Sequence, residues 1–255
     1  MGRGGNSVAT PPNTVTLPGY RLWEGNVPLL HPPRLADQAQ KVQHYLMQGT
    51  DILSEVLAVE PPDATAMLVA NEDWRNAPRE SERPYPMGLP YFTRSVAPPA
   101  LVLPEELSPI FQPRTAATPP LAIWHELAHA FLLQREVVKT PAWLGEFVPQ
   151  AAAVVVARRM RLSLSGHLKH VEDAPGLTVR GFEGRGEAGI QMLHQNLLLR
   201  FATAALEEFG EGLLERLFQA LWDEDKIVDE RRAEKLLAAA LGPRGSEWLQ
   251  SRTEF

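Results

Sequence analysis

The spacing of hydrophobic and polar positions predicts helices for most of the chain after residue 33. Hydrophobic residues recur at intervals of three, four and seven between residues 34 and 56, which is typical of an amphipathic helix. Gly49 lies within this helix and allows a bend there. Shorter apolar runs predict strands at Thr65–Ala70, Tyr91–Thr93 and Ala100–Leu103. Prolines flank the last of these runs, and proline cannot donate to a neighbouring strand, so we expect an edge strand there.

Changes in this pattern along the chain predict three segments. Residues 1–33 are rich in glycine and proline, and we expect them to form an extended N-terminal arm. Residues 34–135 combine the long helix with the strands, so they predict an α+β subdomain. Residues 136–255 predict a helical subdomain, with a glycine-rich loop at 163–187. We therefore expect an α+β fold with a cleft between the two subdomains.

The segment W-H-E-L-A-H-A-F contains the pattern H-E-x-x-H. His125 and His129 are four residues apart, which places both imidazoles on one face of a helix, where both can bind one metal ion. Glu126 lies beside the first histidine, where it can take a proton from a metal-bound water. Thr118 is the expected N-cap of this helix, with Pro119 at its first position. A surface helix with two unrelated histidines is the alternative.

Composition limits what kind of site this can be. The net charge is −6, from 25 basic and 31 acidic residues, which argues against a nucleic-acid partner. The chain has no cysteine, so histidines and carboxylates must hold any metal. No stretch approaches the roughly 18 consecutive apolar residues of a membrane helix. The first residues do not resemble a secretory signal, so we expect a cytoplasmic protein without a membrane partner.

A zinc ion bound by two histidines needs a third protein ligand, and Glu146 is the candidate. Sixteen residues lie between His129 and Glu146. Two antiparallel helices that share a metal site need such a gap for the end of one helix, a turn and the start of the next. A His/His/Glu set leaves one position open, which is the arrangement of a hydrolytic zinc site.

The segments H-E-L-A-H and P-A-W-L-G-E resemble those of the gluzincin metallopeptidases, the thermolysin-like group of zincins, over residues 34–222. Those proteins pair H-E-L-x-H with a downstream P-x-W-L-x-E-G-x-A-E helix. The resemblance implies a small mixed sheet with an edge strand packed on the metal helix, followed by a mainly helical C-terminal half. It implies Zn²⁺ at His125, His129 and Glu146. It also implies hydrolysis of a peptide or protein substrate, with Glu126 as the general base.

The chain departs from the family pattern directly after Glu146. Gln150 stands where the family has a second acid, which often orients a ligating histidine. An amide oxygen can still accept that hydrogen bond, but it carries no charge. Pro149 removes a backbone donor and crowds the carbonyl of Gly145, so we expect this helix to kink or to start again there.

The family also uses a tyrosine or histidine from its C-terminal half to stabilise the oxyanion. All four tyrosines of this chain precede the metal helix. Related aminopeptidases carry the donor some fifteen residues before a Tyr-Gly pair, and Phe209-Gly210 resembles that pair. Counting back leads to His194, our candidate donor, and to Gln195. A histidine among apolar residues is also typical of a protein core.

Two functional hypotheses follow from these residues. The first is a zinc-dependent metallopeptidase, and Glu126 favours it because a purely structural site has no use for a carboxylate there. The second is a zinc-binding but non-catalytic domain with a structural or regulatory role. Gln150 and the lack of a C-terminal tyrosine favour this second hypothesis.

Overall fold

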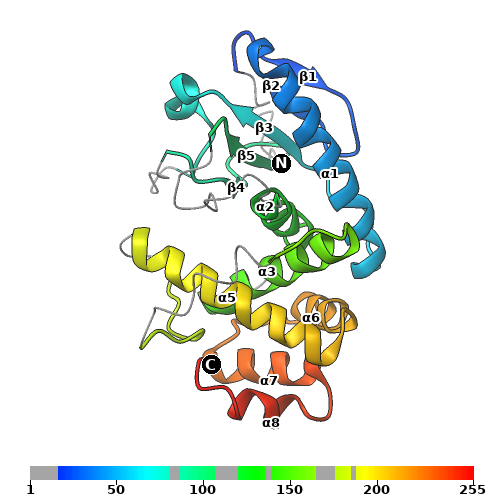
Figure 1. Ribbon diagram of the computed structural model, residues 1–255, viewed down its shortest axis with the longest axis vertical. Helices are drawn as coiled ribbons and strands as arrows, with labels where there is room; N and C mark the ends of the chain where they lie inside the picture. The colour runs from blue at the N-terminus through cyan, green and yellow to red at the C-terminus, as the bar shows by residue number, and fades with distance from the viewer. Residues whose placement is uncertain (1–16, 81–86, 107–119, 136–138, 165–175, 185–187) are drawn as a thin grey trace, which may run out of the picture.

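A computed structural model describes residues 17–80, 87–106, 120–135, 139–164, 176–184 and 188–255. It shows a mixed α+β protein with a small sheet at one end and a mainly helical half at the other (Figure 1). None of the helices in the described part of the chain is long and apolar enough to cross a membrane.

The sheet has five strands in the order β1-β2-β3-β5-β4. Their bounds are Arg21–Trp23 for β1, Leu29–His31 for β2, Thr65–Val69 for β3, Tyr91–Thr93 for β4 and Ala100–Pro104 for β5. The β2–β3 and β3–β5 pairs are parallel, and the two outer pairs are antiparallel. The three predicted strands are therefore present, within a residue of their expected ends.

The segment expected as an extended arm contributes the strands β1 and β2, residues 1–16 lie outside the described part of the chain, and the division at residue 33 stays a prediction. One expectation about the sheet is wrong. The edge beside the metal helix is β4, because β5 pairs with β3 on one side and with β4 on the other. Pro99 precedes β5 and Pro104 is its last residue, so the missing backbone donors fall at the strand ends, where pairing stops.

Both faces of the sheet are covered, which explains the uninterrupted apolar runs of β3 and β5. On one face Leu68 and Leu101 belong to the main core, together with the helices α1 (Ala36–Leu57) and α2 (Leu121–Leu132). On the other face Met67 and Val102 pack with Trp74 of the 3₁₀ helix Asn71–Asn76.

The helix α1 runs through Gly49 without interruption. A Cβ atom at Gly49 would lie 2.6 Å from Cδ1 of Trp124 and 3.1 Å from a methyl carbon of Leu127, both on α2. The indole nitrogen of Trp124 donates to the carbonyl of Tyr45, one turn earlier on α1, at 3.0 Å. Gly49 therefore permits the close approach of α1 to the helix with the H-E-x-x-H segment.

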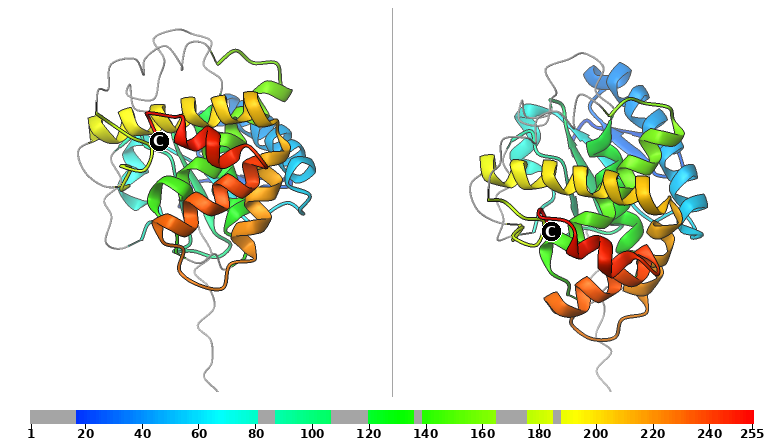
Figure 2. Two further views of the ribbon diagram at one scale, coloured as in Figure 1. Left: turned by 90° about the horizontal axis from the view of Figure 1, so that it is seen from below. Right: turned by 60° about the horizontal axis from the view of Figure 1, so that its bottom comes forward.

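The helical half lies on the other side of α2 from the sheet (Figure 1, Figure 2). Its helices are α3 (Ala142–Arg159), α5 (Ala188–Phe209), α6 (Gly212–Trp222), α7 (Glu230–Leu241) and α8 (Gly245–Gln250). The hydrophobic core is continuous from the sheet and α1 into these helices. The division into two subdomains at residue 135 stays a prediction.

The helix α3 continues through Pro149, so the expected restart at this residue is wrong. The residues after Pro149, from Ala151 to Ala157, are all buried, and their packing holds the helix together across the missing hydrogen bond. At the start of α3, Trp143 is fully buried. Its indole nitrogen donates to Glu230 of α7 at 2.8 Å, and its ring meets that of Phe255 edge to face.

We predict that Gly49→Ala destabilises the protein. The new methyl group would overlap Trp124, and this overpacking outweighs the gain in helix propensity, so we expect a net loss of about 1–2 kcal/mol. Unfolding in denaturant measures it. Gly212→Ala on α6 is the control, because its nearest atom is the flexible end of Arg216, at 3.1 Å. If Gly49→Ala is as stable as the parent, α1 does not need this glycine.

Candidate metal centre

The helix α2 carries both histidines and the glutamate of the H-E-x-x-H segment. It begins at Leu121, after Pro120, while the expected cap at Thr118 and Pro119 lies outside the described residues. Three large side chains on the opposite side of α2 are completely buried: Trp124, Leu127 and Phe131. Their burial against α1 and the core turns His125 and His129 away from α1, toward α3.

The helix α3 packs against α2 and brings Glu146 to both histidines. The Nε2 atom of His125 lies 3.2 Å from Nε2 of His129 and 3.1 Å from Oε2 of Glu146. The Nε2 atom of His129 lies 3.6 Å from Oε1 of Glu146. The structure thus brings together the three ligands expected from the sequence, and their ligand atoms all lie within 4.8 Å of one another.

These separations fit a tetrahedral metal ion. With metal–ligand bonds of about 2.0–2.2 Å, two ligand atoms at the corners of a tetrahedron lie roughly 3.3–3.6 Å apart. The two histidine nitrogens are 3.2 Å apart, and the closest approaches to Glu146 are 3.1 Å from His125 to Oε2 and 3.6 Å from His129 to the other oxygen, Oε1. Two imidazole nitrogens and a carboxylate also match the donor set that zinc prefers when thiolates are absent. The three residues can therefore hold such an ion with little rearrangement.

The protonation states of the three side chains depend on one another. Burial lowers the pKa of His129 to about 4, so its ring is neutral at neutral pH, as a metal ligand must be. Burial also acts to lower the pKa of His125, but the hydrogen bond with Glu146 and the charge of that carboxylate raise it overall. Burial alone would raise the pKa of Glu146, yet the two histidines and a hydrogen bond from Gln195 lower it to about 2.

Glu126 lies beside these residues but outside the group that converges on one point. Its side chain is buried, and this burial raises its pKa to about 7 despite the nearby charge of His125. The backbone of Phe92, the middle residue of β4, also hydrogen-bonds the carboxylate and lowers the pKa. Because this bond stabilises the ionised carboxylate of Glu126, the donor is the backbone N–H of Phe92. The true edge strand therefore contacts the candidate base directly.

Two glutamines extend the cluster from the metal ligands toward α5. The amide nitrogen of Gln195 donates to Oε2 of Glu146 at 2.9 Å. The amide nitrogen of Gln150 donates to Oε1 of Gln195 at 2.5 Å. The described hydrogen bond of Gln150 runs to Gln195, and no described contact joins Gln150 to a ligating histidine, so its role as an acceptor from a histidine stays a prediction. Nothing in the sequence pattern indicated the contact between Gln195 and Glu146, which are 49 positions apart.

His194, the expected oxyanion donor, lies on α5 next to Gln195. Its ring meets that of Phe182 edge to face, with 5.7 Å between the ring centroids. Burial lowers its pKa. No contact among the described residues joins His194 to the three metal-ligand candidates. Its role as a donor stays a prediction.

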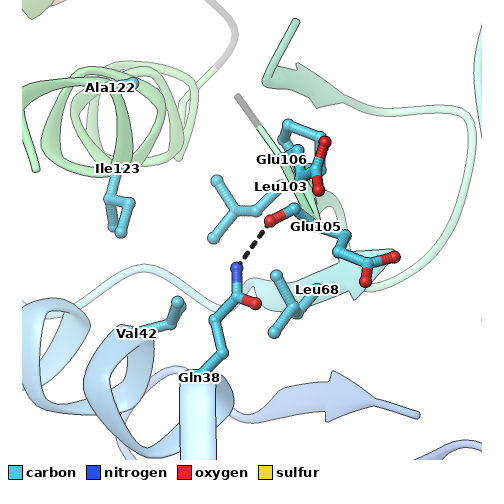
Figure 3. Close-up of a pocket in the computed structure, with 9 residues that line it drawn as sticks. Gln38, Val42, Leu68, Leu103, Glu105, Glu106, Ala122 and Ile123 are labelled. Atoms are coloured by element: carbon cyan, nitrogen blue, oxygen red, sulfur yellow. Dashed lines mark hydrogen bonds between the residues drawn. The ribbon is translucent and has the colours of Figure 1, made fainter. Parts of the chain in front are cut away.

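A separate cavity of about 280 Å³ lies at the N-terminal end of α2, between α1 and the ends of β3 and β5 (Figure 3). Its floor is apolar, and the side chain of Gln38 crosses it to donate to the carbonyl of Glu105 at 2.7 Å. Ala122 and Ile123 of α2 line this cavity, but none of the metal-ligand candidates does. It is therefore distinct from the metal centre.

Comparisons with known proteins support the fold. No family model matches the sequence, and no curated protein matches it. A solved structure of yeast LTA4 hydrolase in complex with bestatin is similar over 92% of this chain, with a TM-score of 0.58 and 11% sequence identity. The matched region is 38% of that chain, so this chain spans well under half its length. At this identity the likeness concerns the fold alone, and it fits the zincin-like fold implied by the motif.

Proposed function

We propose that the protein is a zinc-dependent metallopeptidase that hydrolyses peptide bonds. The observation that carries the proposal is the position of Glu126. Its buried carboxylate lies beside the His125, His129 and Glu146 cluster without joining it. A structural zinc site is closed by four protein ligands and has no use for a costly buried carboxylate that lies beside the metal without binding it.

The chemistry needs a base next to the attacking water. A zinc ion, when bound, would supply Lewis-acid chemistry, lowering the pKa of water toward about 7 and polarising the substrate carbonyl. Glu126 would accept the proton of the water at its carboxylate and pass it to the leaving amine. Burial raises the pKa of the Glu126 carboxyl in the metal-free protein, and this suits a group that must both take up and release a proton near neutral pH.

The edge of the sheet supports a peptide or protein as the proposed substrate. The strand β4 is paired only on the side of β5 within the described sheet, and its other side approaches Glu126 through Phe92. A strand edge that is not paired with another strand can pair with an extended peptide through backbone hydrogen bonds. A peptide or protein segment bound along β4 would bring its carbonyl groups close to Glu126.

Two independent observations support this proposal. One is the local match to the gluzincin motif, which depends on a few residues in two helices. The other is the likeness in fold to a solved hydrolase, which extends over 92% of the chain at only 11% identity. The motif supports the choice of metal ligands and base, and the likeness in fold supports the arrangement of the helices and strands that hold them.

We predict that the purified protein binds one zinc ion per chain. The variants His125→Ala, His129→Ala and Glu146→Ala should each lose most of the zinc affinity, because the two remaining ligands hold zinc weakly. Metal analysis after dialysis against limiting zinc measures this. His44→Ala is the control, since His44 is exposed on α1 and far in sequence from the cluster. Full zinc occupancy in Glu146→Ala would remove that residue from the site.

We predict that Glu126→Gln keeps zinc but loses at least roughly a hundredfold in peptide hydrolysis, because the amide has the shape of the carboxylate but cannot accept the proton. Cleavage of a mixed peptide library, followed by mass spectrometry, avoids assuming a particular substrate. Zinc content serves as the control for an intact site. Equal hydrolysis by parent and variant would contradict the proposed mechanism.

The prediction for His194 is narrower. If this side chain donates to the developing oxyanion, His194→Ala raises the activation barrier by a few kcal/mol and so lowers turnover about a hundredfold. Zinc binding and the fold are kept. Peptide hydrolysis and zinc content measured on one preparation test this. Unchanged turnover would assign the donor to another group and leave the zinc site intact.

A further inference from the structure

Gln150, Gln195 and Glu146 form a continuous chain of hydrogen bonds that ends at a metal-ligand candidate. Gln150 and Glu146 are one turn apart on α3, and Gln195 reaches them from α5, which packs against α3. The bonds are 2.5 Å from Gln150 to Gln195 and 2.9 Å from Gln195 to Glu146. All three side chains are partly buried. The arrangement links α3 to α5 through two side-chain amides and one carboxylate.

The charge at one end of this chain determines the direction of every bond in it. An ionised carboxylate can only accept, so Gln195 must present its amide nitrogen to Glu146. The oxygen of Gln195 then faces Gln150, which must in turn present its own nitrogen. Neither amide can be reversed without losing a hydrogen bond. The orientation of Gln195 is therefore held at both of its polar atoms.

Glu146 needs such support more than the histidines do. His125 and His129 both come from α2, and each ring has two rotatable bonds. Glu146 reaches them from a second helix through three rotatable bonds. Gln195 binds Oε2 of Glu146, the same atom that lies 3.1 Å from Nε2 of His125. An oxygen with two lone pairs can accept from Gln195 and still face the histidines.

We propose that Gln150 and Gln195 are positioning residues that hold the carboxylate of Glu146 in its ligating orientation and so strengthen metal binding. The inference rests on the proposed zinc site. It gives Gln150 a role different from that of the family's second acid. That acid acts on a ligating histidine, whereas Gln150 acts on the ligating glutamate, through Gln195.

The test measures the zinc dissociation constant of the full chain by competition with a chelating dye. The variants are Gln195→Met, Gln150→Met and the double substitution, because methionine keeps the length and the helix propensity of glutamine but offers no N–H. Loss of a group that orients a ligand typically weakens metal affinity by about 10- to 100-fold, and we expect this for Gln195→Met. Gln150→Met weakens it less. The double variant equals Gln195→Met, because Gln150 acts only through Gln195.

Two controls separate positioning from general stability. Asn196→Met places the same side chain on the next position of α5, and zinc affinity is expected to stay at the parental value. Thermal unfolding of each metal-free variant shows whether the fold is kept. With Co²⁺ in place of zinc, the visible absorption bands depend on ligand number and geometry. They are expected to change in Gln195→Met and not in Asn196→Met.

Gln150→Glu distinguishes the two roles of this position. An ionised glutamate cannot donate, so Gln195 would turn its nitrogen toward residue 150 and its oxygen toward Glu146. We expect weaker zinc binding at pH 8, whereas an acid that restored the family's arrangement would keep or raise the affinity. Kept or raised affinity would therefore overturn the inference.

The remaining outcomes are also decisive. If the parent protein binds no zinc, the proposed function fails, and the inference fails with it. If the parent binds zinc and Gln195→Met binds it equally well, only the positioning role is overturned. Additive effects of the two methionine substitutions would likewise show that Gln150 does not act through Gln195.

Discussion

The contact between α2 and α3 is the constraint on which the rest of the site depends. The two histidines come from one helix and the glutamate from the other, so the three ligand atoms converge only if this pair of helices keeps its spacing. Each helix is fixed from behind. Trp124 fills the space that Gly49 leaves on α1, and Trp143 is buried near α7 and Phe255. The apolar framework thus holds in place polar groups whose burial would by itself be unfavourable.

The local features of the site could be predicted from the sequence. The four-residue interval of His125 and His129 and the short connection to Glu146 are properties of neighbouring helices, and a single chain displays them directly. The predicted strands at residues 65–70, 91–93 and 100–103 were equally visible, because their apolar runs are bounded by proline or polar residues. These features depend on periodicity and on short distances along the chain.

The features that could not be predicted depend on tertiary packing. The order of strands is not encoded in any one strand, so the proline-flanked β5 was mistaken for the edge that β4 forms. The three-residue strands β1 and β2 are too short to show a period. Pro149 was expected to interrupt a helix that buried neighbours hold together. The partner of Gln150 lies 45 positions away on α5, beyond the range of any local pattern.

The same difference in range has a consequence for the order in which the site can assemble. The contact between His129 and Glu146 closes a loop of 17 residues, and the bond from Gln195 to Glu146 closes one of 49. By the logarithmic dependence of closure entropy on loop length, the longer loop costs about 1 kcal/mol more to close. The ligand cluster is therefore entropically cheaper to form than the bond that orients its carboxylate. During folding, α2 and α3 can associate around the three ligands before α5 adds the amide that completes their alignment.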